Sequence, residues 1–182
     1  QGFKAGLKAE LKAHGKSTKV TYHYLNAQGD QSNLNTMSQQ LVQQKNDLLV
    51  GIATPAAQAL AKKTTTTPTL VTAVTDLKAA GLVKSDSKPQ TNVSGTSDLT
   101  PVGLQLKLLA SMTKGNKPLG IMYNSSEENS VLQVNLAKAY AKKHNLKLKI
   151  VSATSTNDVA SVLAGLTGKV SGLYLPTDNL MA

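Results

Sequence analysis

Three apolar runs in the sequence each end in a small cluster of polar residues, after which a helix-like pattern begins. The runs are residues 48–53, 119–123 and 170–175, and they are followed by Thr54-Pro55, residues 124–127 and residues 176–179. A continuous apolar run is typical of a buried parallel strand. In open α/β sheets, ligands bind outside the carboxyl ends of such strands. The three junctions therefore predict a ligand-binding edge.

Weaker patterns fill in the remaining elements. Further strands are predicted at residues 19–24, 69–74, 92–95 and 146–151. Helices are predicted where apolar residues recur every three or four positions, at residues 3–14, 34–42, 55–63, 76–83, 101–112, 125–145 and 157–166. Leu104, Leu108 and Met112 are expected to form the apolar face of the fifth helix. Thr54 with Pro55, and Ser125 with Glu128, are expected to start the helices that follow them.

The alternation of strands and helices predicts an α/β fold with parallel sheets. The order of strand and helix begins again after residue 97. We therefore expect two Rossmann-like lobes, 1–97 and 98–182, with a hinge crossing near residues 96–100. A length of 182 residues allows one ordinary domain or two small lobes.

The charge and the amino-acid composition narrow the possible classes of function. The net charge is +10 and all twenty basic residues are lysine, scattered without a run of five. Specific base readout prefers the arginine fork, so we expect no nucleic-acid partner. The chain has no cysteine, which excludes disulfides and thiolate sites within these residues.

Patterns of enzyme and cofactor sites are absent. The sequence has no Gly-x-Gly-x-x-Gly, no P-loop, no Gly-x-Ser-x-Gly and no pair of histidines at metal-ligand spacing. Glu127 and Glu128 are adjacent, and adjacent residues on a helix do not face each other. We expect no catalytic residues, no metal and no cofactor. A hydrolase or transferase would need its nucleophile and base from outside these residues.

The junctions suit a small zwitterion. The side chains of Thr54, Asn124, Ser125 and Ser126, with free helix-end N–H groups, offer a site for a carboxylate. Asp178 or Asp98 could hold an ammonium group. This combination favours an amino acid as ligand. The alternative is that these residues are only helix caps.

Five motifs in order resemble a known family. They are residues 53–59 (ATPAAQA), 72–76 (TAVTD), 92–98 (NVSGTSD), 123–130 (YNSSEENS) and 174–179 (YLPTDN). Together they closely resemble the solute-binding components of bacterial ABC transporters, in the family that includes tryptophan- and tyrosine-type binding proteins. The resemblance covers nearly the whole chain.

This resemblance implies a type I periplasmic-binding fold, whose two lobes close on a ligand about a hinge. Its implied cleft residues share a position at strand ends facing the ligand. They are Thr54, Thr72 and Ala73 in the first lobe, Ser97 and Asp98 at the hinge, and Asn124, Ser125, Ser126 and Glu127 in the second lobe. Asp178 is implied to meet the ligand ammonium group.

The resemblance also implies a setting. We expect an extracytoplasmic protein, periplasmic or a cell-surface lipoprotein, that presents an amino acid such as tryptophan, tyrosine or phenylalanine to an ABC permease. The chain is expected to be incomplete at both ends, because it lacks the family's first strand and its later hinge crossings. The alternative is the ligand-sensing domain of a transcription regulator with the same bilobed fold.

Overall fold

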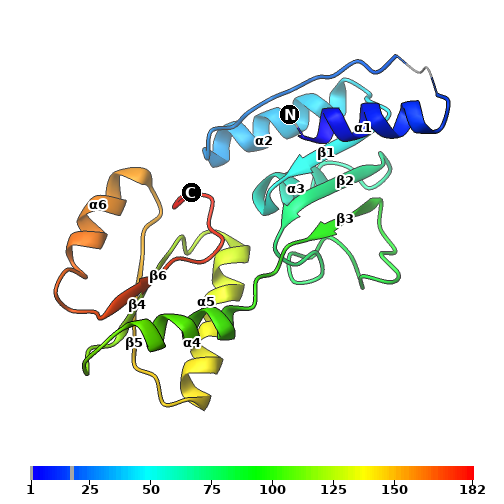
Figure 1. The fold of residues 1–182 in the computed structure, drawn as a ribbon. Coiled ribbons are helices and arrows are strands. Elements are labelled where there is room, and N and C mark those ends of the chain that lie inside the picture. The colour runs from blue at the N-terminus through cyan, green and yellow to red at the C-terminus, as the bar shows by residue number, and fades with distance from the viewer. Residues whose placement is uncertain (1, 17–18) are drawn as a thin grey trace.

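Two three-stranded parallel sheets form the framework of the chain (Figure 1). The computed structural model describes residues 2–16 and 19–182. The first sheet has the order β1-β2-β3, from β1 (Leu49–Ile52), β2 (Thr69–Val74) and β3 (Val93–Ser97). The second has the order β5-β4-β6, from β4 (Leu119–Tyr123), β5 (Leu148–Ser152) and β6 (Gly172–Tyr174). Every strand pairing is parallel, so the predicted α/β class is confirmed.

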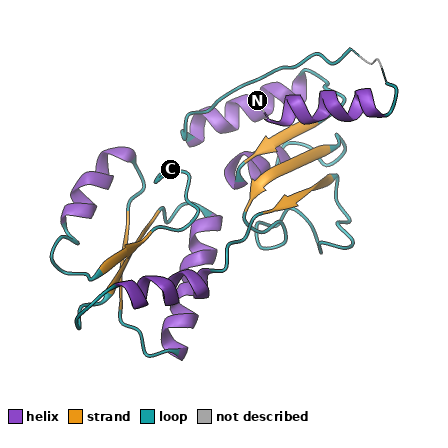
Figure 2. Ribbon diagram, viewed as in Figure 1, coloured by secondary structure: helices purple, strands orange, loops and turns teal. Residues whose placement is uncertain are grey.

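Six helices are described, and those beside the sheets cover their faces (Figure 2). They are α1 (Gly2–Ala13), α2 (Gln31–Gln43), α3 (Thr54–Ala61), α4 (Val102–Met112), α5 (Glu128–Lys143) and α6 (Thr156–Ala164). Helix α3 packs on β1 and β2, whereas α4 and α5 pack on the second sheet and α6 lies on its other side. Among the described residues, no helix is both long and apolar enough to cross a membrane.

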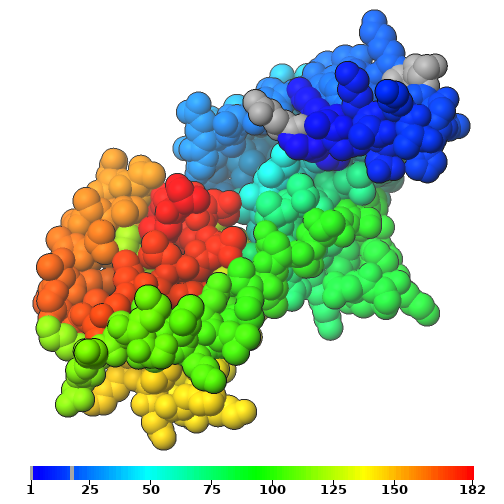
Figure 3. All heavy atoms as spheres, in the orientation of Figure 1, coloured from blue at the N-terminus to red at the C-terminus, as the bar shows by residue number. Residues whose placement is uncertain are grey.

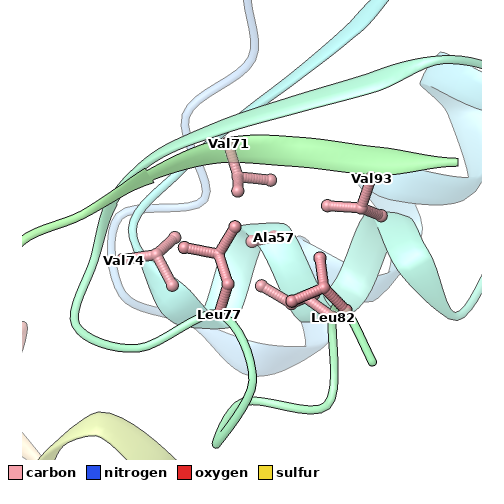
Figure 4. Close-up of a cluster of buried hydrophobic side chains, with 7 residues drawn as sticks. Ala57, Val71, Val74, Leu77, Leu82 and Val93 are labelled. Carbon is pink, nitrogen blue, oxygen red and sulfur yellow. The ribbon is translucent and has the colours of Figure 1, made fainter. Parts of the chain in front are cut away.

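The first core lies between β2, β3 and α3 (Figure 4). Val71 and Val74 from β2 and Val93 from β3 meet Ala57 of α3, and all four are almost completely buried. The segment after β2 completes this core with Leu77, Leu82 and Val83. The helix predicted at residues 76–83 is wrong, because this segment forms turns that end at Gly81 with φ of 71°. Its apolar residues follow the shape of the core and not a helical period.

The second core confirms the buried strand predicted from the apolar run at residues 119–123, which forms β4. Leu119, Ile121 and Met122 are at most 4% exposed, as expected for a central parallel strand. Leu106 of α4 and Val134 of α5 pack on it.

The predicted apolar face of α4 is wrong. Leu104, Leu108 and Met112 are 61–73% exposed, and the buried residues are Val102 and Leu106. Gly103 explains the rotation of the helix, because a Cβ there would lie 2.7 Å from the Tyr140 ring of α5. The small residue therefore selects the face that approaches α5.

Three local predictions also differ from the structure. Residues 19–24 form no strand, because no described residue pairs with them, and Tyr24 is exposed. Helix α3 begins at Thr54 itself, after Ala53, so the threonine is not its cap. Helix α5 begins at Glu128 after Glu127 and has no side-chain capping bond, so the predicted Ser125–Glu128 capping box does not form.

The chain passes from the first sheet to the second through residues 98–101, which lead from β3 into α4 (Figure 3). The two sheets correspond to the lobes expected from the sequence. The lobe boundaries, 1–97 and 98–182, stay a prediction.

Replacing Gly51 tests the packing of α3 on β1. A Cβ at Gly51 would lie 2.9 Å from the Ala57 Cα, a backbone atom that cannot move alone. We expect Gly51→Ala to lower the free energy of unfolding by about 1–3 kcal/mol, as overpacking does. Gly6→Ala on α1 is the control, because no atom lies within 4 Å of its Cβ position. Urea unfolding measures both, and equal midpoints for the two variants would contradict this packing.

Candidate functional site

Two alanines with unusual backbone angles mark the carboxyl edge of the first sheet. Ala53, directly after β1, has φ of 78° and ψ of 153°, and Ala73 at the end of β2 has φ of 54°. At Ala73 the register between β2 and β3 shifts. Residues other than glycine rarely have a positive φ. This backbone conformation costs about 1–3 kcal/mol per residue, and such strained residues cluster at functional sites. This edge is therefore a candidate for function on backbone grounds alone.

The Asp178 carboxylate links the polar residues at the edge of the second sheet. It is 5% exposed and accepts four hydrogen bonds. Its Oδ2 accepts from the Asn124 N–H at 2.6 Å and the Ser130 hydroxyl at 2.7 Å. Its Oδ1 accepts from the N–H groups of Leu180 and Met181 at 2.9 and 3.2 Å. A carboxylate has about four acceptor positions, so this one is fully occupied by the chain.

Asn124 and Glu127 extend the same network. Asn124 Nδ2 donates to Glu127 Oε1 at 3.1 Å, while Asn124 Oδ1 accepts from the N–H and hydroxyl of Ser126. Glu127 Oε2 accepts from Asn129 Nδ2 and from the backbone and side-chain amides of Asn179. Both side chains are buried. The turn after β4 is thus fixed to the segment after β6.

Helix α5 supplies three buried polar residues that are not among the predicted site residues, namely Asn129, Ser130 and Gln133. Gln133 is fully buried and binds the backbone and hydroxyl of Thr177. Their spacing along α5 places them near one another on one face. That spacing is the sequence signal of this arrangement, and it is weak because polar helical residues usually face solvent.

The predicted residues of the first sheet do not enter this network. Thr54 is buried and lies beside the start of α5, with which it shares a small cavity. The Thr72 hydroxyl lies 3.0 Å from that of Thr96, and Ala73 is exposed. Ser97 and Asp98 are exposed at the end of β3, in keeping with the expected crossing. Within the described residues, no hydrogen bond joins these five to the Asn124–Asp178 network.

The arrangement separates buried residues that hold the edge from exposed residues beside them. The side chains of Asp178, Glu127 and Asn124 form their hydrogen bonds with other groups of the protein. Ser125 and Ser126 are exposed beside them and belong to the same turn. A ligand ammonium group at Asp178 would have to displace one of its four donors, so the predicted ammonium contact stays a prediction that this geometry disfavours.

Tyr174 is a buried titratable side chain in the segment that leads to Asp178. Burial raises the pKa of Tyr174, at the end of β6, and a hydrogen bond from Thr100 opposes the shift. The Tyr174 hydroxyl donates to Gln105 Oε1 at 3.1 Å, so it stays protonated and fixes β6 to α4. No group of three or more His, Cys, Asp or Glu residues gathers anywhere in the described part of the chain.

Comparisons with known proteins agree on one family. A family model described as ABC transporter substrate binding protein matches residues 1–182. The tyrosine-binding protein of Clostridioides difficile (strain R20291) is 39% identical over 181 residues, which cover 100% of this chain and 52% of that protein. The chain therefore spans about half the length of this curated relative.

Two solved structures are similar to this chain in both fold and sequence. An ABC domain from Streptococcus pneumonia in complex with L-Trp is 43% identical, with a TM-score of 0.87 over 97% of this chain and 60% of that one. A ligand-free, open substrate binding protein with adhesive properties from Clostridium difficile is 40% identical, with a TM-score of 0.60 over 98% of this chain and 61% of that one. The resemblance and the fold class expected from the sequence are confirmed.

Replacing Asp178 tests the network. In Asp178→Asn, an NH2 group replaces one of the two carboxylate oxygens. The two buried donors that bond to this oxygen would then lose their acceptor. We expect a loss of about 1–3 kcal/mol of unfolding free energy or more. Asp86→Asn, at an exposed aspartate, is the matched control and should change stability by less than about 0.5 kcal/mol. Chemical denaturation of the complete protein measures the difference, and equal stability of the two variants would refute the role of Asp178.

Proposed function

The chain belongs to the family of ABC transporter substrate binding proteins, and from this premise we propose that it forms part of the extracytoplasmic receptor of an ABC importer. In this proposal the receptor binds a small amino acid-like ligand between two lobes and presents the closed form to a membrane permease. The family is one of binding proteins and not of enzymes, and we propose that no chemistry is performed. Family membership favours transport over the regulatory alternative.

The relatives support an aromatic amino acid as ligand. At 39% and 43% identity, one relative is a tyrosine-binding protein and the other is in complex with L-Trp. Similarity to these two proteins is the main support for an aromatic ligand, and the polar edges of the two sheets are consistent with it. Free N–H groups and hydroxyls suit the ligand carboxylate. We propose that Thr54, Thr72 and Ala73 contact the ligand from the first lobe.

The proposed contacts from the second lobe follow from which side chains are exposed. Ser125 and Ser126 are exposed at the turn after β4, whereas Asn124, Glu127 and Asp178 are buried in the network. The N–H and hydroxyl of Ser126 donate to Asn124 Oδ1, so its hydroxyl oxygen remains to accept a hydrogen bond. We propose that the two serines bind the ligand and that the three buried residues hold their turn in place. Ser97 and Asp98 serve the hinge, since they lie where β3 leads toward α4.

Closure on the ligand is the mechanism we propose. The L-Trp complex and the open protein are about equally identical to this chain, yet the TM-scores are 0.87 and 0.60. The structure as a whole is therefore more similar to the L-Trp complex. A ligand that contacts both lobes binds the closed state better and so shifts the population toward it.

Isothermal titration of the complete protein tests the ligand class. We expect tryptophan, tyrosine or phenylalanine to bind, and glucose or adenosine to give no heat. Binding of the sugar or nucleoside with no response to any amino acid would refute the proposal.

A ligand that lacks the ammonium group can show whether Asp178 positions the site or contacts the ligand ammonium group directly. For an amino acid that binds, such as tryptophan, the matched analogue is indole-3-propionate. If Asp178 acts by positioning, Asp178→Asn lowers the affinity for both compounds by a similar factor. A loss confined to tryptophan would instead assign Asp178 to the ammonium group.

A further inference from the structure

Six lysines gather at the amino end of the second sheet, opposite the edge that carries the candidate site. They lie in the three connections that lead into β4, β5 and β6, or in the last turn of α5. All six are exposed, and we call them the amino-edge lysines: Lys114, Lys117, Lys142, Lys143, Lys147 and Lys169.

Hydrogen bonds hold these connections side by side. The Leu119 N–H donates to the Lys147 carbonyl at 2.9 Å, and Ser171 Oγ donates to the Lys117 carbonyl at 3.2 Å. Because β5, β4 and β6 are neighbours in that order, the three connections enter strands that lie about 4.8 Å apart. They lie on the side of the second sheet away from the first sheet (Figure 1). The fold therefore brings together lysines that are scattered in the sequence.

The acidic residues of the second half of the chain lie at the opposite end of the sheet. They follow β3, β4 or β6, or begin a helix, and they are Asp98, Glu127, Glu128, Asp158 and Asp178. The one ion pair within residues 2–16 and 19–182 joins His14 to Glu10. The amino-edge lysines therefore form a positive surface that no neighbouring carboxylate neutralises.

Helix dipoles account for only part of this surface. A lysine in the last turn of a helix stabilises it, and Lys142 and Lys143 occupy such positions on α5. Helices α4 and α6 have no basic residue in their last turn. The other four amino-edge lysines lie in the connections beyond the helices, so capping a helix does not explain them.

We propose that the amino-edge lysines dock the protein on an anionic phospholipid surface. Clusters of about four to eight basic residues bind anionic lipid headgroups. A lysine ammonium is a point charge that suits such a diffuse phosphate surface, and the chain has no arginine fork for reading a defined nucleic acid. A membrane is close at hand because the receptor works beside a permease, a step that rests on the proposed function. Docking leaves Ser125 and Ser126 accessible, since they lie at the other end of the sheet.

Co-sedimentation of the complete protein with vesicles, without any amino acid, tests this surface. We expect binding to vesicles of equal parts phosphatidylglycerol and phosphatidylcholine, and none to pure phosphatidylcholine. Binding should weaken as NaCl is raised, because the Debye length falls from about 10 Å at 0.1 M to about 3 Å at 1 M. Changing Lys114, Lys117, Lys147 and Lys169 together to Gln should lower the partition coefficient by at least about tenfold, since each lysine near an anionic surface contributes up to about fivefold.

The matched control removes the same net charge from the first half of the chain. It changes Lys62, Lys78, Lys84 and Lys88 to Gln, all of them exposed, and should bind vesicles far better than the amino-edge variant. Circular dichroism should show wild-type folding for both variants.

Three results would overturn the proposal. They are equal binding of the wild type to the two kinds of vesicle, equal losses in the two quadruple variants, and tighter binding to double-stranded DNA than to the anionic vesicles at equal phosphate concentration. Tryptophan titration is a separate readout, because vesicle binding needs no amino acid and the amino-edge variant should keep the wild-type tryptophan affinity. A wild type that binds the anionic vesicles but no amino acid would refute the proposed ligand and leave this surface in place.

Discussion

The structure of the candidate site depends on one buried carboxylate. Asp178 accepts hydrogen bonds from the turn after β4, from α5 and from the backbone that follows β6. A buried carboxylate is costly unless its charge is met by donors, and here four donors meet it. Burial and bonding therefore reinforce each other: the aspartate is stable inside only if three segments come together around it. This requirement fixes the exposed serines at positions 125 and 126 relative to the sheet behind them.

The two sheets contribute in different ways. The edge of the first sheet is shaped by backbone strain at Ala53 and Ala73, whereas that of the second is fixed by side-chain hydrogen bonds. The register between β2 and β3 shifts where Ala73 lies, and a saturated network keeps a turn rigid. Both features order the proposed binding edge before any ligand arrives, which reduces the ordering cost of binding. The small contact between α3 and α5 is where the two edges already touch.

The sequence predicted the parallel strands well, because a central strand such as β4 is apolar at every position and leaves little alternative. It predicted α4 poorly: residues 102–112 carry apolar side chains on more than one face, and the close approach of Gly103 to Tyr140 decided which face is buried. Asn124 and Asp178 were found from their place after a strand. Asn129 and Gln133 were missed, since only tertiary structure shows that polar positions of α5 face inward. The saturation of Asp178 could not be predicted either, because its donors are up to 54 residues away in sequence.

The central claim is that the Asp178 network is formed before ligand binding and positions the cleft. Hydrogen exchange of the Asn124 amide in the complete, ligand-free protein tests it most directly, because this N–H is bonded to Asp178 at 2.6 Å. The account predicts protection similar to that of the β4 amides, with little change when tryptophan is added. Fast exchange in the free protein, with protection only in the presence of an amino acid, would contradict it.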